Sequence, residues 1–497
     1  MKKYIKYILF LSLGILYNCD DAIDIDQPGR LLPENAFLSV DDLEQGLVSV
    51  YGRYDVRREI ELASNYTDEV AEGIGSGGQG RNTGFIFNLN AGTGLAQSFW
   101  GNGYREINAI NRLLAGAENV IPADAAEIDQ KNNILGQLYA LRAFSNFQML
   151  SYFSTDYTDD SALSHILVDF VPIGITTQLL RNTNGEIYQH IEDDLALATS
   201  LVEEQANPVF VSQDFITALR ARMGAYRQDY AAAEANALDI LNRYPLASRA
   251  EYQLLFQDDS NTEVIFKLDR VFNGPFDNQN NWAGNVYAFT NATIGGGPFA
   301  EIGRSLFNLF DPLDIRYTVN VEPSSIVAPS YTTEPNYRLN DVLLVGKYRG
   351  IPQQSLLNDL KVFRASEMVL ILAEVEADRN NFNGATNSTA AYIRQLREAR
   401  FGAVQPLPTY ANSTEAFAAI LNERRIEFAF EGHRWKDLKR MGVRADQGAV
   451  RDPLDASTFN MTPTLPPTDY RFTLPIPLSE LDANPGIRAQ QNPGYGN

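Results

Sequence analysis

Apolar residues recur mostly at helical spacing along this chain. Ser39 can cap a first helix, because the acidic residues after it suit a helix N-terminus, and Leu43, Leu47 and Val50 continue one face. The same spacing predicts helices at about 99–114, 125–153, from 186 onward, 212–226, 230–243, 363–377, 385–400, 415–431 and 435–441. The pattern therefore predicts a mostly helical protein.

Two of these helices form the clearest repeat. Residues 212–226 and 230–243 are joined by a short turn, and alanines on each can face alanines on the other. Small residues at such spacing let two helices pack closely. The joining sequence, Gly-Ala-Tyr-Arg-Gln-Asp-Tyr-Ala-Ala-Ala, resembles the turn of a tetratricopeptide repeat. A looser copy is predicted at 363–400 and a third helix pair at 415–441.

Two stretches interrupt the helical pattern. Residues 64–94 are rich in Gly, Asn, Ser and Thr, whereas residues 255–350 combine Gly, Pro and Asn with aromatic residues. The first contains G-x-G-x-x-G, but no strand precedes it and no helix start follows, which favours a flexible surface loop over a dinucleotide site. The second is predicted to hold short strands or long loops. Helices before and after these stretches predict one body with an inserted lobe.

The N-terminus has the features of a lipoprotein signal. Three lysines precede an apolar run that is too short to cross a bilayer, which needs about 20 residues. The run ends at Cys19, the single cysteine, and the preceding Leu-Tyr-Asn resembles a lipobox. Residues 1–18 are predicted to be a signal peptide, and residues 19–36 a tether lipidated at Cys19. The alternative is a chance cysteine near a cleavage site.

The acidic balance of the chain argues against a nucleic-acid partner. Its 41 basic and 62 acidic side chains give a formal charge of -21, which becomes -24 when residues 1–18 and their three lysines are removed. Such a surface repels phosphate groups, and no basic patch interrupts it. We therefore expect no nucleic acid among the partners.

No spacing typical of a catalytic or metal site stands out. The three histidines lie outside any zinc-binding motif, and no G-x-S-x-G motif is present. Carboxylate pairs are so frequent in an acidic chain that they carry little weight as a glycosidase signature. Residues 258–261 lack EF-hand spacing and are interpreted as a solvated turn. We expect a protein that is not an enzyme and needs no metal or cofactor.

Charged and apolar residues alternate closely between residues 422 and 442. Residues three or four apart on a helix lie on one face, so opposite charges such as Arg424 and Glu427 can pair. One interpretation is an anion or sugar site; the other is a half-buried ion-pair network that fixes a helix to the core. We favour the network, because the charges alternate too closely with core residues to line an open cleft. Its residues are Glu423, Arg424, Arg425, Glu427, Glu431, Arg434, Trp435 and Asp437.

This segment is similar to the C-terminal signature of the SusD/RagB family, which runs roughly E-R-R-x-E-x-x-x-E-G-x-R-x-x-D-L-x-R. Four further stretches resemble family motifs, in the same order along the chain. They are the helix with Trp100, Tyr104, Ile107 and Asn111, the segment 141–144, the helix from Arg364 to Glu374, and the ending at 474–477 and 491–495. The resemblance runs from Cys19 to Tyr495.

The resemblance implies a SusD-like fold. Residues 37–497 are expected to form one mostly helical body built on tetratricopeptide-like helix pairs, at about 95–245 and 361–442. An irregular, loop-rich lobe with a few short strands is expected at about 64–94 and 255–350.

The resemblance also implies a function. A lipid-anchored protein of the outer membrane, facing the cell exterior, is expected to capture oligosaccharides and deliver them to a SusC-like TonB-dependent transporter. A peptide ligand, as in the RagB branch, is the alternative, and a glycoside hydrolase is a less favoured one. The acidic surface slightly favours a neutral glycan.

The ligand site is predicted in the loop-rich lobe. Sugar recognition stacks a ring on an aromatic face and satisfies hydroxyls with polar side chains. Trp282 is the tryptophan left for such a platform, because Trp100 and Trp435 belong to predicted structural helices. The alternative is that Trp282 anchors a loop. The predicted ligand-binding residues are Asn65, Asp68, Glu69, Arg81, Asn281, Trp282 and Tyr287.

Overall fold

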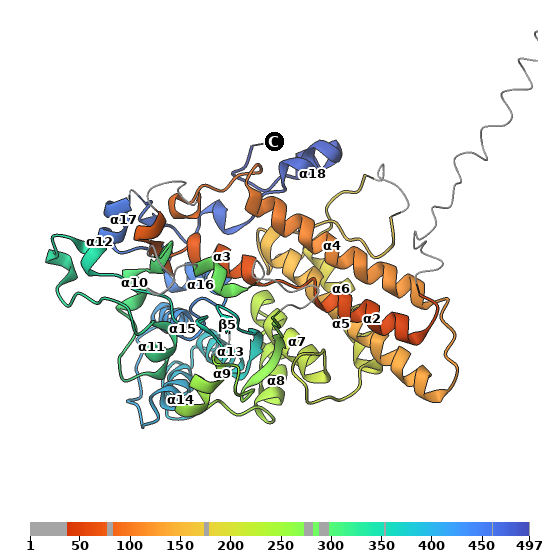
Figure 1. Ribbon diagram of the computed structural model, residues 1–497, viewed down its shortest axis with the longest axis horizontal. Coiled ribbons are helices and arrows are strands. Elements are labelled where there is room, and N and C mark those ends of the chain that lie inside the picture. Colours follow the sequence, from red (N-terminus) through yellow and green to blue (C-terminus); the bar gives the residue numbers. More distant parts are fainter. Residues whose placement is uncertain are drawn as a thin grey trace, which may run out of the picture.

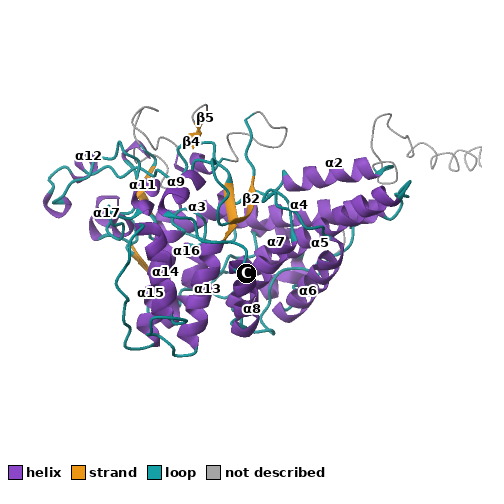
Figure 2. Ribbon diagram, turned by 90° about the horizontal axis from the view of Figure 1, so that it is seen from below, coloured by secondary structure: helices purple, strands orange, loops and turns teal. Residues whose placement is uncertain are grey.

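The computed structural model describes residues 37–76, 83–172, 178–272, 282–287, 298–351, 354–459 and 461–496. Within these ranges helices dominate, and strands occur as four short antiparallel pairs (Figure 2). The predicted fold class, mostly helical with a few short strands, is confirmed. The predictions for residues 1–36, including Cys19, and for Arg81 and Asn281 lie outside the described residues.

The helices fall into two groups joined by α7 and α8 (Figure 1). In chain order, the helices that begin before the second irregular stretch are α2 (Val40–Tyr51), α3 (Arg57–Asn65), α4 (Gly94–Ala117), α5 (Ala125–Phe153), α6 (Asn184–Leu201), α7 (Gln213–Arg227), α8 (Tyr230–Leu241) and α9 (Arg249–Leu255). The later ones are α10 (Arg304–Phe307), α11 (Ile315–Asn320), α12 (Tyr337–Asn340), α13 (Ala365–Asp378), α14 (Thr389–Phe401), α15 (Ser413–Glu427), α16 (Arg434–Ala445), α17 (Pro453–Phe459) and α18 (Leu478–Ala483).

Each strand pairs with one partner. The pairs are β1 (Val70–Glu72) with β3 (Ala300–Ile302), β2 (Val264–Leu268) with β6 (Leu360–Arg364), β4 (Gly350–Ile351) with β5 (Gln354–Ser355), and β7 (Ala449–Val450) with β8 (Thr464–Leu465). The first two pairs join segments that are far apart in the sequence. The β1–β3 pair joins the two irregular stretches to each other, and the β2–β6 pair joins the second stretch to the strand that leads into α13.

Helix α2 begins where the sequence predicts. The Ser39 hydroxyl accepts the backbone N–H of Asp42 at 3.2 Å, and the Asp42 carboxylate accepts the backbone N–H of Ser39 at 2.9 Å. This capping box satisfies two N–H groups that a helix start leaves without partners. Leu43, Leu47 and Val50 are buried, and α2 packs against α4 and α5.

The predicted alanine-rich helix pair is confirmed as α7 and α8. Gln228 adopts a left-handed conformation that ends α7, and the Asp229 carboxylate accepts the N–H of Ala232 at 3.2 Å to cap α8. Gly224 permits the close approach, because a Cβ there would lie 2.8 Å from the Ala233 backbone nitrogen. The two later predicted pairs appear as α13 with α14 and α15 with α16.

Helix α15 ends earlier than the periodicity predicts. The prediction runs to residue 431, but the helix stops at Glu427. Phe430 and Gly432 have φ values of 64° and 85°, which end a right-handed helix. A Cβ at Gly432 would lie 3.1 Å from the Glu59 Cβ, so the turn also requires a small residue. The turn lets α16 fold back onto α15 and contact α3.

Residues 64–73 differ from the predicted surface loop. They are buried, and residues 70–72 form β1. Arg451 reaches this segment and donates to the carbonyls of Asn65 at 2.8 Å and Thr67 at 3.0 Å. A polar segment can be buried when its backbone groups are hydrogen-bonded in this way. The prediction of a flexible surface loop is therefore wrong for these residues.

The largest cluster of buried apolar residues draws on distant parts of the chain. It includes Val40, Phe144, Phe363 and Met461, so helices before and after the irregular stretches contribute to it. Among the described residues, no helix combines the length and apolar character needed to cross a membrane.

Candidate ligand-binding site

The two irregular stretches meet at one edge of the molecule. Strand β1 of the first pairs with β3 of the second, with Ala71 opposite Glu301. Beyond the strands, Gly73 donates its N–H to the carbonyl of Phe299 at 2.8 Å. Helices α10, α12 and α17 lie together at this end (Figure 1). The expected convergence of both stretches on one lobe is therefore found.

Two tyrosines form a half-exposed aromatic patch on this lobe. The rings of Tyr331 and Tyr337 have centroids 6.1 Å apart and planes tilted by 41°. Asn308 is exposed beside them, and its amide donates to the Tyr331 hydroxyl at 3.2 Å. We call Tyr331, Tyr337, Asn308, Asp452 and Asp455 the tyrosine patch.

The Tyr331 ring is fixed by a hydrogen bond and a cation–π contact. Its hydroxyl donates to Asp452 at 3.0 Å. The guanidinium of Arg304 lies 3.9 Å from the ring centroid, in cation–π contact. Arg304 is itself buried and paired with Asp341 at 2.8 Å. The ring therefore has a fixed orientation before any ligand arrives.

Tyr337 is held by a buried carboxylate. Its hydroxyl donates to Asp455 at 2.7 Å, and Asp455 also accepts the backbone N–H of Arg304 at 2.7 Å. Burial raises the pKa of Asp455 to about 6, which these hydrogen bonds partly oppose. The neighbouring Arg338 donates to the carbonyl of Glu72 at 3.0 Å, which ties α12 to β1.

The chemistry of the patch suits recognition of a polyhydroxylated ligand. Tyrosine rings offer apolar faces, and amide, hydroxyl and carboxylate groups beside them offer donors and acceptors. The carboxylates of Asp452 and Asp455 already accept hydrogen bonds from the two tyrosines. Across the described ranges, no group of three His, Cys, Asp or Glu side chains is placed to hold a metal ion.

The predicted polar ligand contacts lie beneath the surface. Asp68 is 2% exposed and contacts Arg434 at 2.9 Å and Arg425 at 3.4 Å. Burial favours the protonated form, but the two arginines outweigh it and hold the pKa of Asp68 well below its usual value. Glu69 accepts the N–H of Phe430 at 3.2 Å, and burial raises its pKa to about 7. Their role as ligand contacts stays a prediction, as does that of Asn65, which is also buried.

The predicted aromatic contacts are also covered. Trp282 is 2% exposed and packs against Leu356 and Leu357 under the β4–β5 hairpin. Tyr287 is fully buried, with its hydroxyl 2.8 Å from that of Ser64. A stacked sugar needs an open ring face, which neither offers here. Their role in binding stays a prediction, and the loop-anchor alternative for Trp282 matches its surroundings.

The sequence did not single out Tyr331 and Tyr337. Both lie in a stretch with many aromatic residues, and no local sequence pattern there distinguishes a buried ring from an exposed one. Their partners Asp452 and Asp455 come more than 100 positions later, beyond the repeat helices. The pair of carboxylates three apart after residue 450 is the one signal available, and it is common in an acidic chain.

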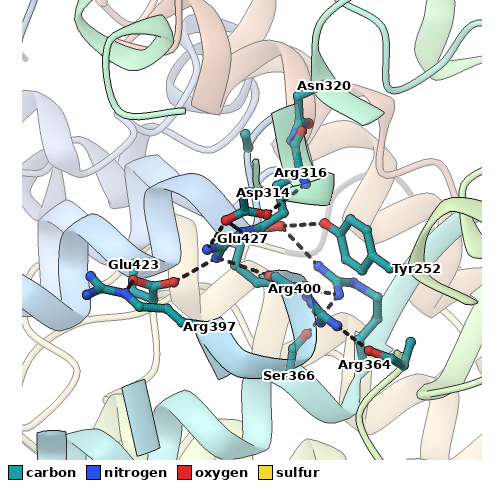
Figure 3. Close-up of polar contacts among 12 residues, drawn as sticks. Tyr252, Asp314, Arg316, Asn320, Arg364, Ser366, Arg397, Arg400, Glu423 and Glu427 are labelled. Atoms are coloured by element: carbon teal, nitrogen blue, oxygen red, sulfur yellow. Dashed lines mark hydrogen bonds and ion pairs between the residues drawn. The ribbon is translucent and has the colours of Figure 1, made fainter. Parts of the chain in front are cut away.

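The charged signature is buried in the interior. Glu423 accepts from Arg316 at 2.7 Å, and Glu427 accepts from both Arg364 and Arg400 at 2.8 Å (Figure 3). Burial favours protonation of Glu427, but these arginines hold its pKa well below the usual value. The remaining members are also buried, and their contacts include Arg424 with Asp437 at 2.8 Å, Glu431 with Lys347 at 2.6 Å and Trp435 with Tyr152.

A sequence model of the SusD family matches residues 319–495, which contain this signature and the tyrosine patch apart from Asn308. SusD-like protein P2 of Formosa agariphila is 24% identical over 537 aligned positions that cover all of both chains. SusD-like protein P25 of the same organism is 22% identical over 96% of this chain and 97% of its own. The C-terminal part of this chain thus matches the SusD family, and the chain as a whole is similar to SusD-like proteins.

Solved SusD-family structures have the same fold. A SusD superfamily protein from Bacteroides thetaiotaomicron covers 92% of this chain and 100% of its own, with a TM-score of 0.76 and 23% identity. A protein from Bacteroides vulgatus described as a putative sugar binding protein covers 93% and 100%, with a TM-score of 0.73 and 21% identity. At these identities, the likeness establishes the fold and leaves the ligand to be argued from the site.

Proposed function

We propose that this SusD-like chain is a surface lipoprotein of the outer membrane that captures oligosaccharides at the tyrosine patch. It then passes them to a SusC-like TonB-dependent transporter. The observation that carries the proposal is the fixed pair of half-exposed rings, Tyr331 and Tyr337, with hydrogen-bonding groups beside them. The description of a solved relative as a putative sugar binding protein supports the same ligand class.

The charge around the patch supports a neutral glycan. Asp452 and Asp455 accept hydrogen bonds from the two tyrosine hydroxyls, and the whole chain has a formal charge of -21. Salt screens distant charges beyond about 8–10 Å, so the nearby carboxylates matter most. A sulfated or carboxylated sugar placed on the rings would be repelled at short range by these two carboxylates. An uncharged chain of hydroxyl-bearing rings meets no such repulsion.

We further propose that the protein binds without cleaving. A glycosidase needs one carboxylic acid and one carboxylate that face the scissile bond. The carboxylates at the patch already have partners in the protein. Asp452 and Asp455 accept hydrogen bonds from the tyrosine hydroxyls, and Asp341 forms an ion pair with Arg304. They hold the aromatic rings in place and support a capture role.

Calorimetric titration tests the proposal with neutral xylo-, cello- and manno-oligosaccharides, alginate oligosaccharides and short peptides. We expect a neutral oligosaccharide to bind, and Tyr331→Ala and Tyr337→Ala to weaken it about tenfold or more, through loss of stacking and buried area. Phe170→Ala removes an exposed aromatic ring elsewhere and should leave binding unchanged. The recovered oligosaccharide should be intact by chromatography.

Other outcomes would contradict specific parts of the proposed function. Binding of peptides alone would favour the RagB-like alternative. Degradation of the glycan would contradict the proposed binding role. Undiminished glycan binding by both tyrosine variants would place the ligand elsewhere. Copurification of this protein with a TonB-dependent transporter from outer membranes tests the delivery step, and its absence under mild detergent would argue against it.

A further inference from the structure

A cavity of about 360 Å³ opens on another part of the molecule, where none of the tyrosine-patch residues lines it. It lies where the segment after α5, the α7–α8 turn, α16 and residues 467–473 meet. Pockets for small ligands typically occupy about 300–1,000 Å³. The cavity therefore has room for one small ligand.

Tyr226 supplies an unpartnered hydroxyl to this cavity. Its side chain is 2% exposed, and its ring is fixed by Phe147 and Tyr157, each with a centroid 5.2 Å away. The hydroxyl makes no hydrogen bond to any residue that the structure describes. Buried polar groups are normally hydrogen-bonded. Because Tyr226 lines the cavity, its hydroxyl can bond to whatever occupies the cavity, whether solvent or a ligand.

Tyr470 forms an aromatic wall. It is 43% exposed, and its ring packs edge-on against Tyr495 with centroids 4.9 Å apart. Gly494, with φ of 85°, lies against the ring so closely that a Cβ there would be 2.3 Å from a ring carbon. The glycine lets the ring stand at the mouth of the cavity with part of it open.

Polar groups of both kinds surround the cavity. Lys439 donates its ammonium protons to the carbonyls of Ser151 and Ser154, and within the described residues it has no carboxylate in ion-pair contact. The ammonium nitrogen also lies 4.5 Å from the centroid of the Tyr157 ring, in cation–π contact. The exposed Asp156 and the amide of Gln228 also line the cavity. The cavity thus combines hydrogen-bond donors and acceptors.

We propose that this cavity binds one neutral saccharide unit, as a second carbohydrate site separate from the tyrosine patch. An anion would meet Asp156 in the cavity lining, and a cation would meet Lys439. A fully apolar ligand would leave the Tyr226 hydroxyl without a partner. A pyranose satisfies all three conditions, because it has an apolar face for Tyr470 and hydroxyls that both donate and accept.

The proposal is tested by saturation-transfer NMR and calorimetry with glucose, galactose, mannose, xylose and their β-1,4-linked disaccharides. We expect at least one to bind and Tyr226→Phe to weaken it about three- to tenfold, the effect of one hydrogen bond. Tyr470→Ala should weaken it similarly. Because the Tyr226 hydroxyl has no protein partner, Tyr226→Phe should keep the thermal midpoint of the parent.

Two comparisons separate this site from the proposed capture site. Tyr410→Phe removes another buried hydroxyl without a partner, outside the cavity, and should leave binding unchanged. Tyr331→Ala should retain binding of the small sugar. If no sugar of the panel binds, or if Tyr226→Phe and Tyr470→Ala both bind like the parent, the second site is refuted. Capture at the tyrosine patch is tested separately, by Tyr331→Ala and Tyr337→Ala.

Discussion

Asp68 and Arg434 lie 366 positions apart in the chain and are joined by two hydrogen bonds of 2.9 and 3.0 Å. Asp68 precedes β1 in the irregular lobe, and Arg434 is the first residue of α16. Both side chains are buried. One ion pair therefore connects the base of the lobe to the helix that carries the family signature, and it sets the position from which β1 and β3 extend.

Loss of Arg434 should destabilise the fold before it affects any ligand. Arg434→Ala leaves the buried Asp68 carboxylate with the more distant Arg425 and the backbone N–H of Val450, and breaking such a pair costs about 3–5 kcal/mol of unfolding free energy. Urea denaturation measures this directly. Arg488→Ala breaks an exposed pair with Asp482 and should change stability by no more than about 1 kcal/mol. Unchanged stability with lost glycan binding would instead make Asp68 or Arg434 part of a ligand site.

Trp282→Ala should lower stability rather than act on binding alone. The side chain is 2% exposed against Leu356 and Leu357, and truncation of a buried large aromatic costs about 3–5 kcal/mol. Thermal unfolding and glycan titration of the same sample separate the two effects. Tyr331→Ala, at a half-exposed ring, provides the contrast, with weaker binding and a smaller loss of stability. Normal stability combined with lost binding would restore Trp282 as a sugar platform.

Asp455 should make the stability of the lobe depend on pH. Burial raises its folded-state pKa from 3.8 to about 6, so the folded protein favours the protonated form. Its contribution to stability is complete below about pH 4 and is lost as pH rises through about 6. Asp455→Asn removes this dependence and can still bond Tyr337. The difference in unfolding free energy between the variant and the parent should therefore shift by about 2–3 kcal/mol in favour of the variant as the pH rises from 4 to 7.

Urea titrations at pH 4, 5, 6 and 7 check this dependence. Asp482→Asn serves as the control, because the Asp482 carboxylate is exposed to solvent. Parallel stability profiles for Asp455→Asn and the parent would mean that Asp455 is already ionised throughout this range.

Mature protein from the native membrane should begin at an acylated Cys19. The lone cysteine directly follows an apolar run of signal-peptide length. Mass spectrometry of the N-terminal peptide measures the added acyl mass, and Cys19→Ser should release the protein from the membrane fraction. An unmodified N-terminus at another residue would remove the anchor from the proposed function.

The sequence determined the helices and much of their pairing. The capping box at Ser39, the α7–α8 turn and the later helix pairs depend on contacts between residues close in the chain, which periodicity and capping reveal. Gly432 marks a limit of this reasoning: the motif contains the glycine, but the left-handed turn that ends α15 early also depends on Phe430 and on contact with Glu59.

The tertiary structure alone decided which polar and aromatic residues are buried. Composition placed Asp68 and Trp282 in a surface lobe, whereas Arg434, Arg451 and the β4–β5 hairpin cover that region from distant parts of the chain. The same folding brings Asp452 and Asp455 to the hydroxyls of Tyr331 and Tyr337. Hydrophobic periodicity records the local face of each helix or strand, but the burial of a charge depends on which opposite charge arrives from elsewhere in the fold.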